Sequence, residues 1–344
     1  MGGAKTGRVG PLRTAGRGSL SALAVALFAS GCTASAATSG PTNVVTPTQP
    51  ASRTATATVA PPVPAALYPL TNLPGPPNAA TKPVIAVMVH SGPTAVGLGR
   101  ADVIYEEFDG TASFRVIALY QSNAAPVVGP VIDTRPVDGY LLGVLDPVVV
   151  STGGPKGFIA QLDANKVVDA SALAHPTLYH QPGPFVTTAS FVPFAHPGTV
   201  PPIFTFASSG SGPGVKGVKV TGSVVIAVPG YPAQTWTYDA KTGLWREPAM
   251  PWIPPVTNLV VQKVAYHTVL LHHPTGQAVQ TAKVFGTGAA SVLSSGVLIT
   301  CQWRKAGAGA VTNYFDRNGI VVQFRAGRTA VLLAPAGTTV KVVG

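Results

Sequence analysis

The composition of the chain changes abruptly near residue 66, and this boundary limits which part of it can fold. Residues 33–65 are rich in Thr, Ala, Pro and Ser, with Arg53 as their one charged residue and no aromatic residue. Such a segment buries too little apolar surface to offset the conformational entropy lost on ordering. We therefore predict a disordered tether over residues 32–65 and a folded part over residues 66–344, long enough for one large core or two lobes.

The first 31 residues carry the features of an export signal. Residues 1–19 contain four basic and no acidic residues, and a ten-residue apolar run follows at positions 20–29. That length suits a signal-peptide core, whereas a membrane-spanning helix needs about 20 residues. Small residues then precede Cys32 in Ala29-Ser30-Gly31-Cys32. We predict a signal peptide over residues 1–31.

The segment before Cys32 resembles the lipobox of bacterial lipoproteins. In such proteins the Cys thiol takes a diacylglyceryl group, and cleavage makes that Cys the new N-terminus. Two acyl chains anchor a protein stably, whereas one holds it only marginally. We therefore expect a lipid on Cys32 and a location on the extracytoplasmic face of the cell membrane. The alternative is an ordinary secretory signal with an incidental cysteine.

Cysteine usage limits how the folded part is stabilised. The chain has two cysteines, Cys32 and Cys301. With Cys32 lipidated no internal disulfide can form, so the fold depends on its hydrophobic core. Cys301 lies in a strand-like apolar run and is interpreted as a buried structural thiol rather than a nucleophile. The four tryptophans are interpreted as core residues, with an exposed polymer-binding face as the alternative.

Apolar runs and turn signals predict the order of secondary structure. Buried strands are expected at residues 83–90, 101–107, 113–121 and 147–152, and helices at 137–145 and 158–165. This alternation indicates a mixed α/β arrangement for residues 66–205. Residues 206–344 contain short strand candidates, among them 223–228, 259–266 and 291–302, separated by Gly-containing turns. The predicted fold class is α/β, of the α+β kind, with a mixed-sheet first lobe and a mainly antiparallel second lobe.

The order of several short motifs resembles a known family. Residues 69–74, 83–89 and 101–106 precede Phe114-Arg115-Val116, Gly129-Pro130-Val131, Arg135-Pro136 and Gly153-Gly154, and residues 236–239, 242–245, 303, 315–316 and 319 follow. This pattern resembles the YerB-like family of bacterial lipoproteins, a domain of unknown function in two adjoining parts, over nearly all of residues 67–344. The resemblance implies an α/β fold and a place in the cell envelope, and it implies no activity.

Seven residues that border predicted strands of the first lobe are candidates for ligand binding. They are Asp102, Tyr105, Glu106, Arg115, Arg135, Gly153 and Gly154. A guanidinium can hold a carboxylate or phosphate with two hydrogen bonds, and the N–H groups of a Gly-Gly turn can face an anion. Because an unpaired charge beside apolar strands is costly, the alternative is internal ion pairing of the two arginines with Asp102 and Glu106.

No catalytic or metal site has convincing spacing in this sequence. A glycosidase needs two carboxylates beside the bond it cleaves, but the neighbours Glu106 and Glu107 would face opposite ways on a strand. A cell-wall glycan hydrolase or transferase that uses Glu106 or Asp109 is nevertheless the alternative function. The seven histidines show no zinc-binding spacing, and neither a nucleophile elbow nor a phosphate loop occurs. We expect no cofactor, no catalytic residue and no metal site.

Charge is divided unevenly between the two predicted lobes. Residues 66–200 hold six Lys and Arg against nine Asp and Glu, whereas residues 201–344 hold twelve against three. Attraction to polyanions therefore acts mainly on the second lobe. Outside the membrane such partners are lipid headgroups or wall polymers, and the compartment excludes nucleic acid. We predict a non-catalytic module that binds an envelope protein or an anionic wall component, with a merely soluble basic surface as the alternative.

Overall fold

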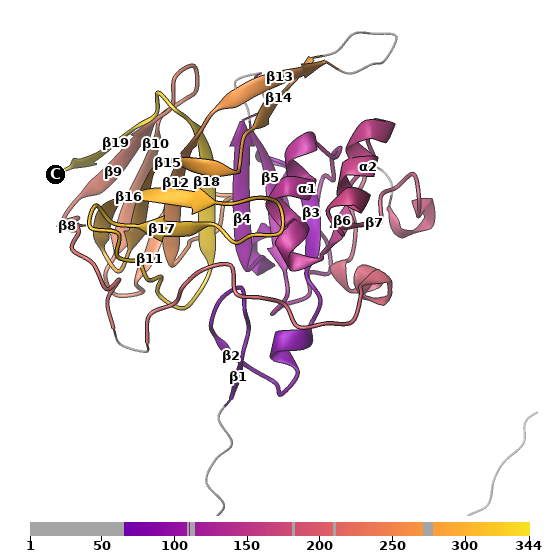
Figure 1. Ribbon diagram of the computed structural model, residues 1–344, viewed down its shortest axis with the longest axis horizontal. Coiled ribbons are helices and arrows are strands. Elements are labelled where there is room, and N and C mark those ends of the chain that lie inside the picture. The colour runs from indigo at the N-terminus through magenta and orange to yellow at the C-terminus, as the bar shows by residue number, and fades with distance from the viewer. Residues whose placement is uncertain (1–64, 109, 111–113, 181–182, 209–210, 271–277) are drawn as a thin grey trace, which may run out of the picture. The chain divides into compact units, whose positions relative to one another are not determined.

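The computed structural model describes residues 65–344 except 109, 111–113, 181–182, 209–210 and 271–277 (Figure 1). The described residues all belong to one compact unit, residues 61–344. The predicted signal peptide, Cys32 and all but the last residue of the predicted tether lie outside them. Within the described part of the chain, no helix is long and apolar enough to cross a membrane.

A mixed sheet runs through both predicted lobes. Among the described residues it contains eleven strands, in the order β17-β16-β15-β12-β18-β4-β5-β3-β6-β7 with β8 beside β16. The strands are β3 (Ile85–His90), β4 (Val103–Phe108), β5 (Phe114–Tyr120), β6 (Val148–Val150), β7 (Val168–Asp169), β8 (Val218–Lys219), β12 (Asn258–Val264), β15 (Gly286–Ser294), β16 (Val297–Lys305), β17 (Asn313–Phe315) and β18 (Thr329–Pro335). Strand β18 pairs in parallel with β12 on one side and β4 on the other, which joins the lobes.

Smaller antiparallel units flank this sheet. Strands β9 (Ser223–Ala227), β10 (Gln234–Asp239), β11 (Leu244–Arg246) and β19 (Thr339–Val343) form a second sheet in the order β11-β10-β9-β19. Val224, Ile226 and Trp236 are buried on its inner face while neighbouring threonines are exposed, the alternation expected of a half-buried sheet. Two further hairpins pair β1 (Ala66–Leu67) with β2 (Pro74–Gly75) and β13 (Tyr266–Leu270) with β14 (Ala278–Ala282).

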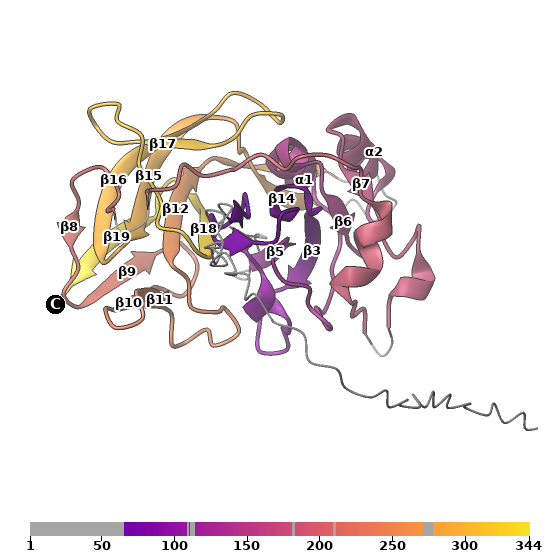
Figure 2. The same ribbon diagram turned by 90° about the horizontal axis from the view of Figure 1, so that it is seen from below.

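Two short α-helices lie on one face of the first lobe (Figures 1 and 2). They are α1 (Pro136–Leu142) and α2 (Lys156–Ala164). Proline at the first turn of α1 suits a helix start, because its missing N–H would have no partner there. The remaining helical turns are the 3-10 segments η1 (Ala79–Thr81), η2 (Leu98–Arg100), η3 (Gly143–Leu145), η4 (Pro176–Leu178) and η5 (Thr188–Phe194).

Strand β3 shows why the central sheet is buried on both faces. Ile85, Val87 and Val89 belong to one hydrophobic cluster, whereas Ala86 and Met88 belong to another that also contains apolar residues of α1 and α2. Each fully buried aliphatic side chain of this kind contributes roughly 1.5–3 kcal/mol of transfer free energy. Both clusters lie inside residues 61–344, so this unit contains its own core.

The predicted fold class is confirmed, whereas the strands predicted over residues 291–302 and 320–324 are wrong, the latter showing only isolated bridges. Residues 291–302 form the end of β15 and the start of β16 rather than a single strand. Ser295 and Gly296 both have positive φ, at 51° and 75°. Two such residues between antiparallel strands form the tight turn whose twist matches a hairpin. Ser294, Ser295 and Gly296 separate the two apolar runs and mark this turn in the sequence.

Candidate functional site

Arg115 lies at the centre of a buried cluster of charged side chains. Its Nη1 atom is 3.1 Å from Glu107 Oε2 and 2.8 Å from Asp138 Oδ1, and its Nη2 donates to Asp138 Oδ2 at 3.0 Å. The three side chains are at most 3% exposed. This two-pronged grip on one carboxylate is the strong form of an ion pair. Arg115 is therefore internally paired, although with Glu107 and Asp138 rather than with Asp102 and Glu106.

Four elements meet at this cluster. Glu107 and Arg115 are cross-strand neighbours on β4 and β5. Asp138 sits in the first turn of α1, where its Oδ2 accepts the N–H of Arg135 at 2.8 Å. Glu107 Oε1 accepts the N–H of Ala282, on β14, at 3.0 Å. Burial raises the pKa of Glu107 to about 7, against the opposing attraction of Arg115. The cluster thus fastens α1 and the β13–β14 hairpin to the central sheet.

Sequence reasoning missed Asp138 as a partner of Arg115. An acidic residue three positions after Arg135, just inside a helix that begins with proline, is a recognisable helix N-terminus signal. That signal identifies the cap, but it does not identify an arginine 23 residues earlier as the ion-pair partner.

Asp102 lies at the opposite end of β4 and stabilises a turn. Its carboxylate accepts the N–H groups of Gln121 and Ser122, both at 2.7 Å, and the Ser122 hydroxyl. Burial raises its pKa, while these hydrogen bonds and the nearby Arg328 act to lower it. Both of its oxygens are engaged by the chain after β5, so Asp102 is positioned as a structural residue.

Glu106 faces the side of β4 opposite to Glu107, as strand geometry predicts. It is 2% exposed, and its Oε2 accepts a hydrogen bond from Gln234 Nε2 at 3.3 Å. Its Oε1 has no partner among the described residues. Burial raises the pKa of Glu106 to about 7, and the negative charge of Glu247 adds to the rise. A sugar could not reach this carboxyl without opening the core, and Asp109 lies outside the described residues.

Replacing Glu106 with glutamine should remove much of the pH dependence of stability. The pKa of this acid is about 7 when folded and 4.5 when unfolded, so its favourable contribution is full below 4.5 and is lost as pH rises through 7. At pH 8 Glu106→Gln should raise the free energy of unfolding by about 3 kcal/mol. Urea unfolding at pH 5 and pH 8 measures this change. Asp163→Asn, at an exposed acid of α2, is the control. An unchanged pH slope in Glu106→Gln would contradict the prediction.

The other residues predicted to bind a ligand also make contacts within the fold. The Arg135 guanidinium lies 3.0 Å from the Asp133 carboxylate near the surface. Tyr105 is buried in the core, and burial raises its pKa. The Gly153 N–H donates to Ser151 Oγ at 3.1 Å. Gly153 has a φ of 106°, which favours glycine, so Gly153-Gly154 is a strand-ending turn. Arg115 and the backbone of Arg135 both bind Asp138, and the Gly153 carbonyl accepts the N–H of Thr134, next to Arg135, at 2.9 Å.

A groove in the second lobe carries unpaired cations. Its volume is about 630 Å³, and Lys216 and Arg317 line it together with Thr300 and Asn318. Lys219 follows Val218, a lining residue on β8, and is exposed beside the groove. None of the three cations forms an ion pair with another described residue. These residues make up what we call the cationic groove.

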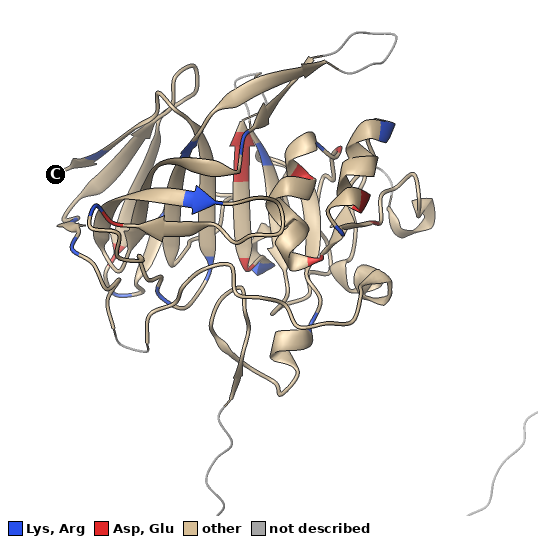
Figure 3. Ribbon diagram, in the orientation of Figure 1, with Lys and Arg blue, Asp and Glu red and all other residues tan. Residues whose placement is uncertain are grey.

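Asp316, the acidic residue that lines the cationic groove, accepts hydrogen bonds from its own loop. Asp316 Oδ1 accepts the N–H groups of Asn318 at 2.8 Å and Ile320 at 2.9 Å. The first lobe carries acidic residues on β4, α1 and α2, while Lys and Arg are spread over the second lobe (Figure 3). Two cations, Lys216 and Arg317, therefore face one carboxylate, Asp316, among the described residues that line the groove, which leaves the lining with a net positive charge.

Cysteine and tryptophan do not form a reactive or exposed site in the described residues. Cys301 is buried, and burial raises the pKa of its thiol to about 12, which keeps it protonated. Trp236, Trp245 and Trp303 are core residues, whereas Trp252 is half-buried and donates to Ser91 Oγ at 3.1 Å. No cluster of His, Cys, Asp and Glu in this part of the chain could hold a metal ion.

Comparison with known proteins identifies the family. The profile described as the N-terminal domain of a protein of unknown function (DUF3048) matches residues 70–188, and the corresponding C-terminal domain matches residues 224–331. The crystal structure of the YerB protein from Bacillus subtilis has a TM-score of 0.64 with 17% sequence identity, covering 80% of this chain and 99% of that chain. At this identity the likeness shows the fold alone. Comparison with curated proteins gave no match. The chain belongs to the YerB-like family, whose domain of unknown function is built in two adjoining parts.

Proposed function

We propose that this chain is an exported lipoprotein, anchored through Cys32 to the outer face of the cell membrane, whose folded part binds an anionic polymer of the cell wall without catalysis. The lipobox-like segment before Cys32 supports the anchor. The observation that carries the binding role is the cationic groove, where Lys216, Lys219 and Arg317 are exposed and unpaired among the described residues.

The chemistry of the groove suits repeated phosphate or carboxylate groups. A guanidinium holds such groups with two hydrogen bonds, and an ammonium acts as a compact point charge. Exposed charges of this kind are screened by salt over about 8–10 Å, so binding should weaken as ionic strength rises. A polymer gains from several such contacts at once, because each further contact becomes intramolecular. The tether expected over residues 33–65 would let the folded part reach about 30 Å or more from the anchor.

Neutralising the groove should weaken attachment to the wall. We expect Lys216→Gln with Arg317→Gln, in residues 61–344, to bind purified wall sacculi about tenfold more weakly in co-sedimentation. The matched control is Arg100→Gln with Lys156→Gln, which removes two exposed cations of the first lobe. An equal loss in both variants would indicate a general charge effect and contradict the assignment of the groove. Binding by neither variant nor wild type would point to an envelope protein as partner instead.

A further inference from the structure

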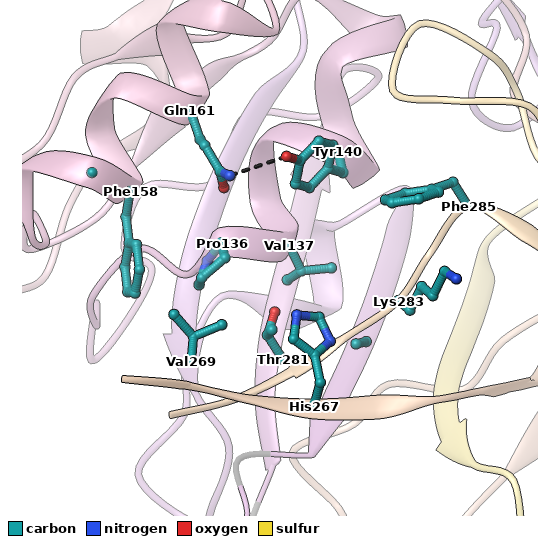
Figure 4. Close-up of a pocket in the computed structure, with 12 residues that line it drawn as sticks. Pro136, Val137, Tyr140, Phe158, Gln161, His267, Val269, Thr281, Lys283 and Phe285 are labelled. Atoms are coloured by element: carbon teal, nitrogen blue, oxygen red, sulfur yellow. Dashed lines mark hydrogen bonds between the residues drawn. The ribbon is translucent and has the colours of Figure 1, made fainter. Parts of the chain in front are cut away.

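A second cavity separates the helices of the first lobe from the β13–β14 hairpin. Its volume is about 510 Å³. Residues of α1 and α2 line one side, Gly157 and Gln161 among them. Residues of the hairpin and of the segment after it line the other side, Thr281 and Lys283 among them (Figure 4). We call this cavity the helix–hairpin cleft. None of its residues belongs to the cationic groove. Its size matches pockets that hold small organic ligands.

Much of the cleft wall is apolar. Phe158 and Val269 lie toward one end and Phe285 toward the other, with Val137 between them (Figure 4). Val137, on α1, is buried, whereas Phe285 is 38% exposed although it is a large aromatic residue. A ligand with an apolar body would cover this surface, and burial of its methylene groups would favour binding.

Two polar groups in the cleft lack partners among the described residues. Thr281 is 2% exposed, and its Oγ1 makes no hydrogen bond. Figure 4 shows this hydroxyl pointing from the hairpin toward α1. Across the cleft, Gln161 donates from Nε2 to Tyr140 Oη at 3.0 Å, and its buried Oε1 has no partner. Turning this amide over would leave Nε2 unpaired instead, so one polar atom of Gln161 stays unused in either orientation.

Such unused groups carry a cost in the free protein. A buried polar atom without a partner loses its hydrogen bonds to water without replacement. A ligand that supplies a partner recovers this loss, which favours ligands with hydrogen-bonding groups between the two walls. The hairpin side of the cleft is held in place, because the Ala282 N–H donates a hydrogen bond to Glu107 of the buried charged cluster.

The charged side chains at the cleft favour an anionic ligand. Among the described residues that line it, Lys283 and His267 are basic and no residue is acidic. Both are exposed, and the Lys283 ammonium lies 5.7 Å from the centre of the Phe285 ring with no ion-pair partner in the described part of the chain. Figure 4 shows the His267 ring directed toward α1. A carboxylate or phosphate would complement this side of the cleft.

We infer that the helix–hairpin cleft binds a small amphiphilic anion: an apolar chain or ring against Phe158 and Val269, an anionic group at Lys283, and a hydrogen-bonding group between Gln161 and Thr281. This inference is independent of the proposed wall binding, which uses other residues. The apolar surface, the unpaired polar groups and the positive charge of the cleft together indicate this class of ligand.

N-decanoylglycine is a suitable probe, because it joins an acyl chain, an amide and a carboxylate. Titration calorimetry with residues 61–344 should show saturable binding with a Kd below about 100 µM. The methyl ester, which lacks the charge, should bind about tenfold more weakly. Lys283→Gln should weaken binding of the acid by a similar factor and leave the ester unchanged. Absence of saturable acid binding at about 1 mM would overturn the inference, as would an equal effect of Lys283→Gln on both probes.

Two further variants separate binding in the cleft from damage to the fold. An added Cβ at Gly157 meets no heavy atom within 4 Å, so Gly157→Leu can extend into free space beside the cleft without strain. It should weaken both probes at least about tenfold, because it takes up ligand space. Gly309→Leu, also at an open position, should change neither. Thr281→Val should raise the melting temperature yet weaken binding. Normal binding by Gly157→Leu would place the ligand elsewhere and reject the cleft.

Discussion

Replacing Arg115 with methionine should lower the free energy of unfolding by about 3–5 kcal/mol, because it leaves buried acids without their cation. Asp138 would lose both hydrogen bonds from the guanidinium, and Glu107 would lose its contact at 3.1 Å. The side chains are almost fully buried, so water cannot replace the lost partner. Urea unfolding of residues 61–344 at pH 7 measures the change.

Arg135→Met is the matched control for this prediction. Arg135 is also an arginine beside an acid, but its partner Asp133 is 42% exposed, so its loss should cost less than about 1 kcal/mol. Adding Glu107→Gln to Arg115→Met should recover part of the stability, because one of the two uncompensated acids is removed. Equal losses in Arg115→Met and Arg135→Met would show that the buried cluster does not stabilise the fold.

Cys32→Ser should abolish attachment of lipid to the protein. Serine has no thiol to receive the diacylglyceryl group, and two acyl chains supply the stable attachment that a single chain cannot. We expect the variant in the culture medium or as an uncleaved precursor. Fractionation with radiolabelled palmitate follows both the location and the lipid. Cys301→Ser, at the buried thiol, should keep its label. Continued lipid labelling of Cys32→Ser would contradict the anchor.

Local patterns predicted the elements of the first lobe well. The runs at residues 83–90 and 147–152 contain β3 and β6, because strands buried on both faces read as unbroken apolar sequence. The helices expected at residues 137–145 and 158–165 correspond to α1 and α2, with boundaries shifted by a few residues. These features depend on neighbouring residues, and so the sequence expresses them directly.

Features that depend on distant pairing could not be predicted in this way. Strand β18 lies between β12 and β4, although more than two hundred residues separate it from β4, and no local signal encodes that neighbour. The same holds for the hydrogen bond from Ala282 to Glu107, which spans 175 residues.

The candidate sites show the same difference between local features, which the sequence predicts, and long-range contacts, which it does not. The sequence singled out Arg115 as a costly charge beside apolar strands, and the structure supplies its partners. The helix–hairpin cleft has no sequence motif, because its walls come from two segments of ordinary composition that meet only in the fold. The excess of basic residues in the second lobe was visible in the sequence, whereas the convergence of Lys216 and Arg317 on one groove required the structure.

The most direct test of the proposed function is co-sedimentation of residues 61–344 with purified wall sacculi at low and high salt, before and after chemical removal of the anionic wall polymers. The account predicts binding at low salt that is lost at high salt and absent from the stripped sacculi, since exposed cations recognise the polymer charge. Binding that is unchanged by salt and by stripping would contradict it.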